Sequence, residues 1–285
     1  MSRMQSLSRE SSRQNVSTSK TRRRQHIFGT ITALALFGNP IFGGVPAATA
    51  AQATNLCDFA IFIGVRGTGA AAGTNLAHNG RVWTTGGHGA QVAPIVTDLI
   101  NSGDMPFYFE SLAYPATSVL GQSIDDGVAK LTAELNYIAQ TCPWAPIILA
   151  GHSQGASVIS RTLAGPNIAL LSADAKAAVS SVVLYGDPFY ETGRITNYPD
   201  RPNNGAFWDP TDIYDKSKLA DYRHWGYPAG SSTQTWLYRV REYCNIGDYF
   251  CQNNKADSSF VIHNSYIQYA TAVTGWITYT LTDFN

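Results

Sequence analysis

The sequence predicts an α/β fold in which a parallel sheet is covered by helices on both faces. Short apolar runs, typical of buried strands, alternate along the chain with stretches that carry apolar residues at helical spacing. Strands that alternate with helices in this order form parallel sheets. The chain has 285 residues, of which 44% are hydrophobic, so it is long enough for a substantial core in one domain or at most two small ones.

The expected elements follow one another along the chain. The strands are expected at 59–63, 107–112, 147–150 and 181–185, and 236–240 is a candidate for a fifth. The helices are expected over 89–101, 128–138 and 264–281. The second helix should stop near Cys142-Pro143, because proline cannot continue a helix. The interval 201–235 is too long for an ordinary connection.

The two signs of charge are unevenly placed. Residues 1–24 hold seven Lys and Arg but one Glu, and residues 25–50 hold no charged side chain. The remainder has 13 basic and 19 acidic residues, a net charge of −6. An acidic body of this kind does not fit a protein that binds nucleic acid, which needs a basic face to neutralise phosphates.

The N-terminal segment has the three-part layout of a signal peptide. The basic run Arg22–Arg24 precedes an apolar stretch over 27–42, and Ala48-Thr49-Ala50 offers an A-x-A cleavage site. Pro40 interrupts the apolar stretch below the length of about 20 residues that a membrane span needs, which argues against a stable membrane anchor. We expect cleavage after Ala50 or Ala53 and a secreted protein, either extracellular or retained in the cell envelope.

Cysteine usage agrees with export. The chain has four cysteines beyond the leader: Cys57, Cys142, Cys244 and Cys251. An even number in an exported chain indicates two disulfides, and the sequence alone leaves three pairings open. The spacings are not those of paired C-x-x-C knuckles, so a zinc site is disfavoured.

A candidate nucleophile lies in Gly151-His152-Ser153-Gln154-Gly155, which matches G-x-S-x-G. The motif directly follows a predicted strand and precedes a helical stretch that starts at Ala156. This is the setting of a nucleophile elbow, where flanking glycines permit a sharp turn and the serine projects above the sheet. The alternative is a tight strand-to-helix turn in which the serine only supports the turn.

A nucleophilic serine needs a base and a residue that orients the base. In folds with this elbow, the chain order is Ser, then Asp or Glu, then His. Of the two histidines after Ser153, His224 lies in the irregular interval, whereas His263 precedes the closing helix on a loop that can reach the sheet rim. Asp248 lies between Cys244 and Cys251, where a disulfide would fix its loop. It is therefore preferred to five other aspartates: Asp187, Asp209, Asp212, Asp215 and Asp221.

These residues carry a resemblance to the cutinase family. The segment Cys244–Cys251 followed by His263 resembles that family's disulfide loop and catalytic histidine, and 151–155 resembles its elbow. Arg66-Gly67-Thr68-Gly69 resembles its oxyanion loop, and 193–199 is also similar. The resemblance extends from about Cys57 to the C-terminus.

The resemblance implies a single-domain α/β-hydrolase over residues 51–285, preceded by a leader over 1–50. Its five-stranded parallel sheet would be flanked by helices in a flavodoxin-like three-layer sandwich. It further implies Cys57–Cys142 and Cys244–Cys251 disulfides and ester hydrolysis without a cofactor or metal. Carried over by residue, Ser153, Asp248 and His263 form the triad, and the backbone N–H groups of Thr68 and Gln154 form the oxyanion hole. A monomer is expected.

The chain departs from the family at about 201–235. This insertion holds six large aromatic residues: Phe207, Trp208, Tyr214, Tyr222, Trp225 and Tyr227. It is either a surface excursion or a wall beside the active site. A calcium site at Asp209, Asp212 and Asp215 is disfavoured because the number of oxygen ligands is low.

The insertion leaves the ester substrate open among short- to medium-chain acyl esters, lipids, polyesters and acetylated polysaccharides such as acetylxylan. A secreted binding module that keeps the fold without catalysis is the alternative from another class.

Overall fold

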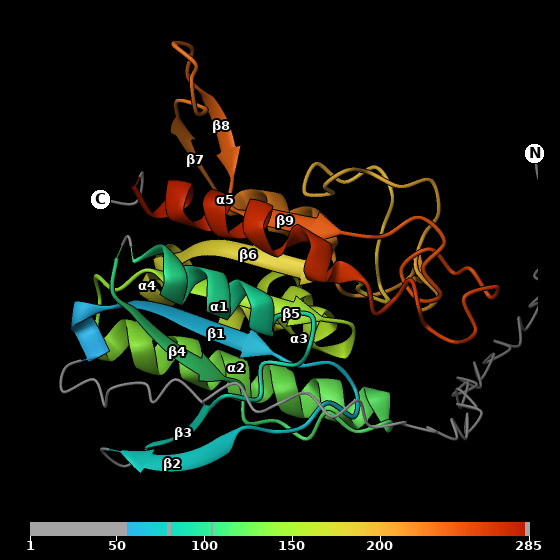
Figure 1. Ribbon diagram of the computed structural model, residues 1–285, viewed down its shortest axis with the longest axis horizontal. Coiled ribbons are helices and arrows are strands. Elements are labelled where there is room, and N and C mark those ends of the chain that lie inside the picture. The colour runs from blue at the N-terminus through green and yellow to red at the C-terminus, as the bar shows by residue number, and fades with distance from the viewer. Residues whose placement is uncertain (1–55, 79–80, 104, 283–285) are drawn as a thin grey trace, which may run out of the picture. The chain divides into compact units, whose positions relative to one another are not determined.

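The computed structural model describes residues 56–78, 81–103 and 105–282 (Figure 1). The predicted leader and its cleavage site lie outside the described residues. None of the helices within this part of the chain combines the length and the apolar character needed to cross a membrane.

The central sheet has five parallel strands in the order β4-β1-β5-β6-β9. Their bounds are Ala60–Val65 for β1, Phe107–Ser111 for β4, Ile147–His152 for β5, Val179–Tyr185 for β6 and Val240–Tyr243 for β9. The first four match the predicted strands closely, and every residue of β1, β5 and β6 is buried. This burial on both faces explains why their sequences are mainly apolar and do not alternate with exposed polar residues, although β6 also holds the buried Ser180 and Ser181.

The predicted fifth strand over 236–240 is wrong in position. Residues Thr235–Tyr238 form β8, which pairs antiparallel with β7 (Arg223–Gly226) in a separate hairpin. The sheet strand β9 begins only at Val240. The change occurs at Arg239, whose N–H donates to Tyr222 O while its own carbonyl accepts from Val182 N. Two strands separated by one residue appear as one run in the sequence.

Helices cover both faces of the sheet (Figure 1). On one face lie α1 (Ala93–Ser102) and α5 (Ala270–Thr282), which share a core with Phe62 of β1. On the other lie α2 (Leu120–Thr141), α3 (Gln154–Ala164) and α4 (Ala173–Ala178), which share a core with Ile61 and Ile63. Successive side chains of β1 therefore pack into two different cores, one on each face of the sheet. The predicted three-layer α/β architecture is confirmed.

Smaller elements surround these layers. A second antiparallel hairpin is formed by β2 (Thr74–His78) and β3 (Arg81–Thr85). The 3-10 helices are η1 (Leu56–Asp58), η2 (Pro166–Leu170), η3 (Lys216–Asp221) and η4 (Tyr266–Tyr269).

The two disulfides are Cys57–Cys142 and Cys244–Cys251. They confirm the pairing that the family resemblance implied. The first joins η1 to the end of α2. The second closes the loop that follows β9, on which Asp248 lies.

The insertion at 201–235 divides into three parts. Its first part lies on the disulfide loop, since Ala206 N donates to Phe250 O at 2.6 Å and Gln252 Nε2 donates to Asn203 O at 2.8 Å. Its middle part carries η3 and packs against α3 through Arg161, whose guanidinium lies 4.1 Å from the centre of the Tyr214 ring. Its last part leads into the β7–β8 hairpin, which projects from the edge of the sheet (Figure 1). The six aromatic residues are therefore dispersed and do not form one wall.

Candidate active site

The backbone at Ser153 has the geometry of a nucleophile elbow. Ser153 joins β5 to α3 with φ 55° and ψ −122°, a conformation that a residue with a side chain rarely adopts. The turn needs both flanking glycines: a Cβ at Gly155 would lie 2.0 Å from Val65 O, and one at Gly151 would lie 2.6 Å from Gly155 O. The Ser153 N–H donates to Tyr185 O at 2.8 Å, which ties the turn to β6.

The Ser153 side chain does not support the turn. Ser153 occupies the N-cap position of α3, but its hydroxyl makes no capping hydrogen bond to the helix. The side chain is also partly exposed. A strained backbone that presents an uncommitted hydroxyl at a helix N-terminus fits a nucleophile better than a structural serine.

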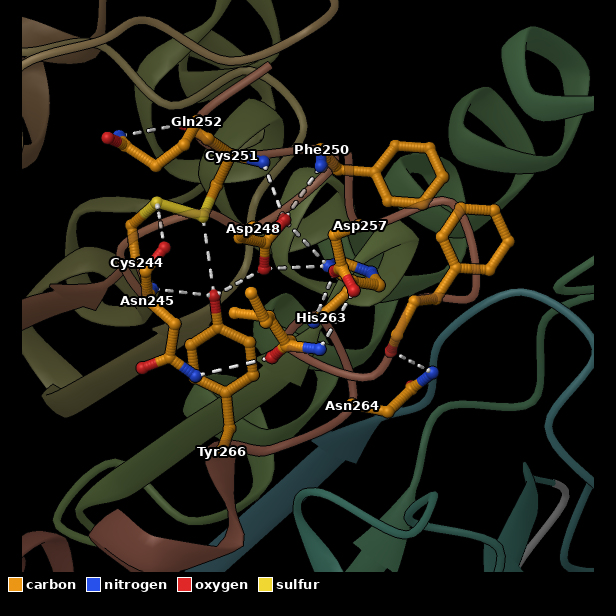
Figure 2. Close-up of polar contacts among 12 residues, drawn as sticks. Cys244, Asn245, Asp248, Phe250, Cys251, Gln252, Asp257, His263, Asn264 and Tyr266 are labelled. Atoms are coloured by element: carbon orange, nitrogen blue, oxygen red, sulfur yellow. Dashed lines mark hydrogen bonds and ion pairs between the residues drawn. A yellow bond between two sulfur atoms is a disulfide. The ribbon is translucent and has the colours of Figure 1, made fainter. Parts of the chain in front are cut away.

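Asp248 and His263 form a buried pair (Figure 2). His263 Nδ1 lies 2.9 Å from Asp248 Oδ2 and 3.1 Å from Oδ1, and the Asp248 side chain has no exposed surface. The carboxylate also accepts hydrogen bonds from Tyr266 Oη at 2.7 Å, Phe250 N at 2.7 Å and Cys251 N at 2.9 Å. Both carboxylate oxygens therefore accept hydrogen bonds, and the imidazole is held through Nδ1.

The hydrogen bonds keep Asp248 ionised despite its burial. Burial alone would raise the pKa of this carboxyl, but the bonds from His263, Tyr266 and Cys251 N–H outweigh the loss of water and lower its pKa below the usual value. The disulfide closes the loop that carries two of the donors, the N–H groups of Phe250 and Cys251. A carboxylate held in this way fixes the imidazole tautomer and stabilises an imidazolium.

Two further residues position the His263 loop, and the sequence reasoning missed both. Asp257 accepts hydrogen bonds from the N–H groups of Ile262 at 3.1 Å and His263 at 3.0 Å. His152 Nε2 lies 2.8 Å from His263 O, and burial lowers the pKa of His152 to about 3, so its neutral ring donates this bond. The only sequence feature that indicates Asp257 is its position six residues before His263.

The structure places Ser153 and His263 against the same segment at the end of β6. Ser153 N bonds to Tyr185 O, and a Cβ at the next residue, Gly186, would lie 3.0 Å from His263 Cε1. Among the described residues, His263 Nε2 has no hydrogen-bond partner, so the Ser153–His263 hydrogen bond is not formed in this structure. Catalytic hydrogen bonds are often long before substrate binds, and an imidazole nitrogen facing no other partner retains its capacity to accept a proton.

The predicted oxyanion donors lie on either side of the elbow. Gln154 is the first residue of α3, so its N–H has no acceptor within the helix. Its side chain is tied away from the site by bonds to Thr117 O at 2.9 Å and from Ser123 Oγ at 3.2 Å. Thr68 is exposed on the loop after β1, and a Cβ at Gly67 beside it would lie 3.4 Å from Ser153 Cβ.

Arg66 holds the loop that carries Thr68. Its Nε donates to Ala70 O at 3.0 Å and its Nη1 to Leu112 O at 3.2 Å, while the Tyr114 hydroxyl donates back to Arg66 O. Gly69 N also donates to Ala116 O at 2.8 Å. The loop is therefore fixed at both ends, as preorganised hydrogen-bond donors require.

Two of the rejected candidates for the triad have other partners. His224 is in the β7–β8 hairpin, where its Nδ1 accepts from Arg239 Nε at 3.4 Å. Asp187 is bound to Lys216 at 2.9 Å. Within the described ranges, no group of three His, Cys, Asp or Glu side chains is arranged to hold a metal ion.

Comparison with known proteins identifies the family. A family model described as Cutinase matches residues 56–281. The chain belongs to the cutinase family. Among curated relatives, Cutinase 11 of Verticillium dahliae is 27% identical over 202 residues, which cover 64% of this chain and 60% of that protein. Acetylxylan esterase 2 of Talaromyces purpureogenus is 25% identical over 174 residues, which cover 55% of this chain and 65% of that protein. The chain thus spans less than two thirds of the length of each.

Solved structures support the cutinase-like α/β-hydrolase fold. The catalytic core domain of acetyl xylan esterase from Trichoderma reesei matches with a TM-score of 0.58 and 20% identity, covering 79% of this chain and 99% of that chain. A fold can be shared by proteins with different substrates, so this likeness concerns the architecture.

Proposed function

We propose that this cutinase-family protein is a carboxylic ester hydrolase that acts through an acyl-enzyme on Ser153. The observation that carries the proposal is the buried Asp248–His263 pair, which lies against the same Tyr185–Gly186 segment as the strained Ser153 elbow. Membership of a family whose relatives are named cutinase and acetylxylan esterase supports the same conclusion.

The chemistry follows from the roles of the three residues. Ser153 Oγ attacks the ester carbonyl carbon while His263 Nε2 takes the hydroxyl proton, and Asp248 stabilises the imidazolium. The N–H groups of Thr68 and Gln154 stabilise the oxyanion, and each donor should contribute about 10²–10³ in rate. The alcohol leaves with the proton from His263. Water, deprotonated by His263, then releases the acid and restores Ser153.

For the substrate we propose short- to medium-chain acyl esters. The Phe250 ring centre lies 4.6 Å from that of His263, and the rings of Phe260 and Phe207 follow at 5.3 and 6.2 Å from Phe250. All three phenylalanines are partly exposed, so an apolar substituent of the ester gains burial against them. Deacetylation of a polysaccharide is the second candidate, because a relative named acetylxylan esterase aligns with more than half of this chain.

We further propose that the hydrolase, over residues 51–285, is exported after removal of the 1–50 leader and acts as a monomer. The two disulfides support export, because disulfides persist in oxidising compartments.

Hydrolysis of p-nitrophenyl esters from acetate to decanoate tests the activity. The wild type should hydrolyse them, Ser153→Ala should abolish turnover at an unchanged Tm, and Ser231→Ala, at an exposed serine in the hairpin turn, should retain full activity. Residual turnover in purified Ser153→Ala would contradict the assignment of the nucleophile. A folded wild type that hydrolyses none of the esters would instead favour the non-catalytic binding module.

A further inference from the structure

The insertion places a buried lysine beneath the candidate active site. Lys216, at the start of η3, is 6% exposed. Its Nζ lies 2.9 Å from Asp187 Oδ2 and 2.6 Å from Glu242 Oε1, and both carboxylates are fully buried. A lysine is almost never buried unless it is paired, because its desolvation must be offset by opposite charge.

The first carboxylate, Asp187, is bound to the helix behind the nucleophile. Asp187 Oδ1 accepts from Ser157 Oγ at 2.7 Å, and Oδ2 accepts from Ser160 Oγ at 2.8 Å. Both serines belong to α3, and the Ser157 N–H donates to Ser153 O at 3.1 Å. The carboxylate therefore fixes the first turns of the helix that starts at the elbow.

Asp187 also belongs to the turn that supports the histidine. It follows Gly186, where a Cβ would lie 3.0 Å from His263 Cε1, and its Oδ1 accepts from Phe189 N at 3.0 Å. A shift of this turn would move the surface against which the His263 ring packs.

The second carboxylate, Glu242, is in the strand that leads to the orienting aspartate. Glu242 is the third residue of β9 and lies two residues before Cys244, where the disulfide loop carrying Asp248 begins. Its backbone is fixed on the outer side by Thr196 and Tyr198, through N–H to O bonds of 2.8 and 2.7 Å. One ammonium group therefore connects the supports of all three triad residues.

We propose that Lys216 is a positioning residue for the triad, holding the α3 helix, the turn after β6 and the end of β9 in register through Asp187 and Glu242. The inference rests on the proposed function, and it gives the middle part of the insertion a role in positioning the catalytic residues. The charges agree with this role. The Asp187 pKa lies below its ordinary value, since Lys216 and the hydrogen bonds of Ser157 outweigh the effect of burial, while burial raises the Glu242 pKa to about 7. Below that pH Glu242 is protonated, so the Lys216 ammonium group faces one carboxylate, that of Asp187.

Lys216→Met tests the proposal, with Lys218→Met as the matched control on the exposed side of the same short helix. We expect kcat for p-nitrophenyl esters to fall 10- to 100-fold in Lys216→Met with KM within twofold, because misplacement of catalytic groups by about 1 Å costs up to about 10² in rate. Lys218→Met should match the wild type. A folded Lys216→Met with wild-type kcat would overturn the proposal.

A second variant separates positioning from plain stability. Lys216→Met with Asp187→Asn removes both charges of the ion pair and should recover much of the lost Tm, so it remains informative if the single variant does not fold. We expect its kcat to stay at least 10-fold low, because the link from Lys216 to α3 and β9 is absent. Recovery of kcat together with Tm would overturn the proposal. An inactive wild type would contradict the proposed function itself, whereas an active wild type with insensitive variants contradicts only the role of Lys216.

Discussion

Two buried aspartates follow adjacent strands of the sheet and are stabilised in different ways. Asp187 follows β6 and Asp248 follows β9, both are fully buried, and the pKa of each lies below the ordinary value. Asp187 faces a permanent cation, Lys216, together with two serine hydroxyls. Among the described residues, Asp248 faces only neutral donors and an imidazole: the Tyr266 hydroxyl, two backbone N–H groups and His263.

The difference explains why only one of them suits a triad. The charge of Asp187 is already compensated by Lys216, and this ion pair stabilises the folded structure. Asp187 would therefore give little additional electrostatic stabilisation to a neighbouring group that becomes positively charged. The charge of Asp248 has no permanent counterion in the part of the chain that the structure describes, so it would be available to stabilise a protonated His263. Fixed dipoles that hold an ionised group in a dry site are the usual basis of electrostatic catalysis.

Exchanging each aspartate for asparagine gives the largest expected effect. Asp248→Asn should lower kcat by about 10⁴, because the amide no longer stabilises the imidazolium or selects the tautomer. Asp187→Asn should lower kcat by about 10–100-fold through misplacement of the elbow. Steady-state kinetics on p-nitrophenyl butyrate, with circular dichroism to verify folding, measures both. Equal losses in two folded variants would contradict the division of roles.

The sequence singles out Asp248 because the constraints on its region are local. Two cysteines seven residues apart enclose the aspartate, and the chain order Ser, Asp, His selects the histidine. The Asp187 region had no such signal. Lys216 lies in an irregular interval 29 residues after Asp187, and only the tertiary fold brings them together. The same limit applies to the aromatic residues of the insertion. They are close together in the sequence, but the tertiary fold places them in different parts of the structure.

The sheet shows the same limit. Buried strands such as β1 and β5 were found from their apolar runs, since no polar face interrupts them. The misplaced fifth strand extends across Arg239, and its first half, Thr235–Tyr238, forms the hairpin although it is richer in β-branched and aromatic residues than Val240–Tyr243. Which half joins the sheet is decided by the pairing of Val182 with Val240, which no local pattern records.

The two disulfides should separate activity from stability. Replacing Cys57 and Cys142 by serine releases a loop of 85 residues and should cost about 4–5 kcal/mol of unfolding free energy, whereas the seven-residue Cys244–Cys251 loop should cost only about 2 kcal/mol. The order reverses for kcat, because the short loop holds Asp248. Denaturant unfolding and kcat measured on both double variants test this. A greater loss of kcat from the Cys57–Cys142 variant while it is folded would refute the comparison.

The two carboxylate networks should respond to pH in opposite directions. The Glu242 pKa is raised from 4.5 to about 7, so its stabilising contribution is complete below pH 4.5 and is lost as the pH rises through 7. The Asp248 pKa is lowered, so its contribution is present above pH 3.8 and is lost as the pH falls through the lower native value. Glu242→Gln should therefore reduce the decline in unfolding free energy between pH 4.5 and 7, measured by urea denaturation. An unchanged slope would show that Glu242 does not titrate in this range.

The smallest expected effect separates the two ends of the insertion. Phe207 lies beside Phe250, which contacts His263, whereas Trp225 is an exposed residue of the hairpin, paired with Trp236 at 5.3 Å. If Phe207 extends the apolar surface that Phe250 and Phe260 form beside His263, Phe207→Ala should lower kcat/KM for the octanoate ester relative to the acetate ester. The expected decrease is about fourfold for each methylene that loses contact, because a buried CH₂ contributes about 0.8 kcal/mol. Trp225→Ala removes a larger ring and should leave the ratio unchanged, because the hairpin joins β9 at the end opposite to Tyr243 and the disulfide loop. An unchanged octanoate-to-acetate ratio in Phe207→Ala would remove the insertion from substrate selection, and a shift in Trp225→Ala would move the acyl site to the hairpin.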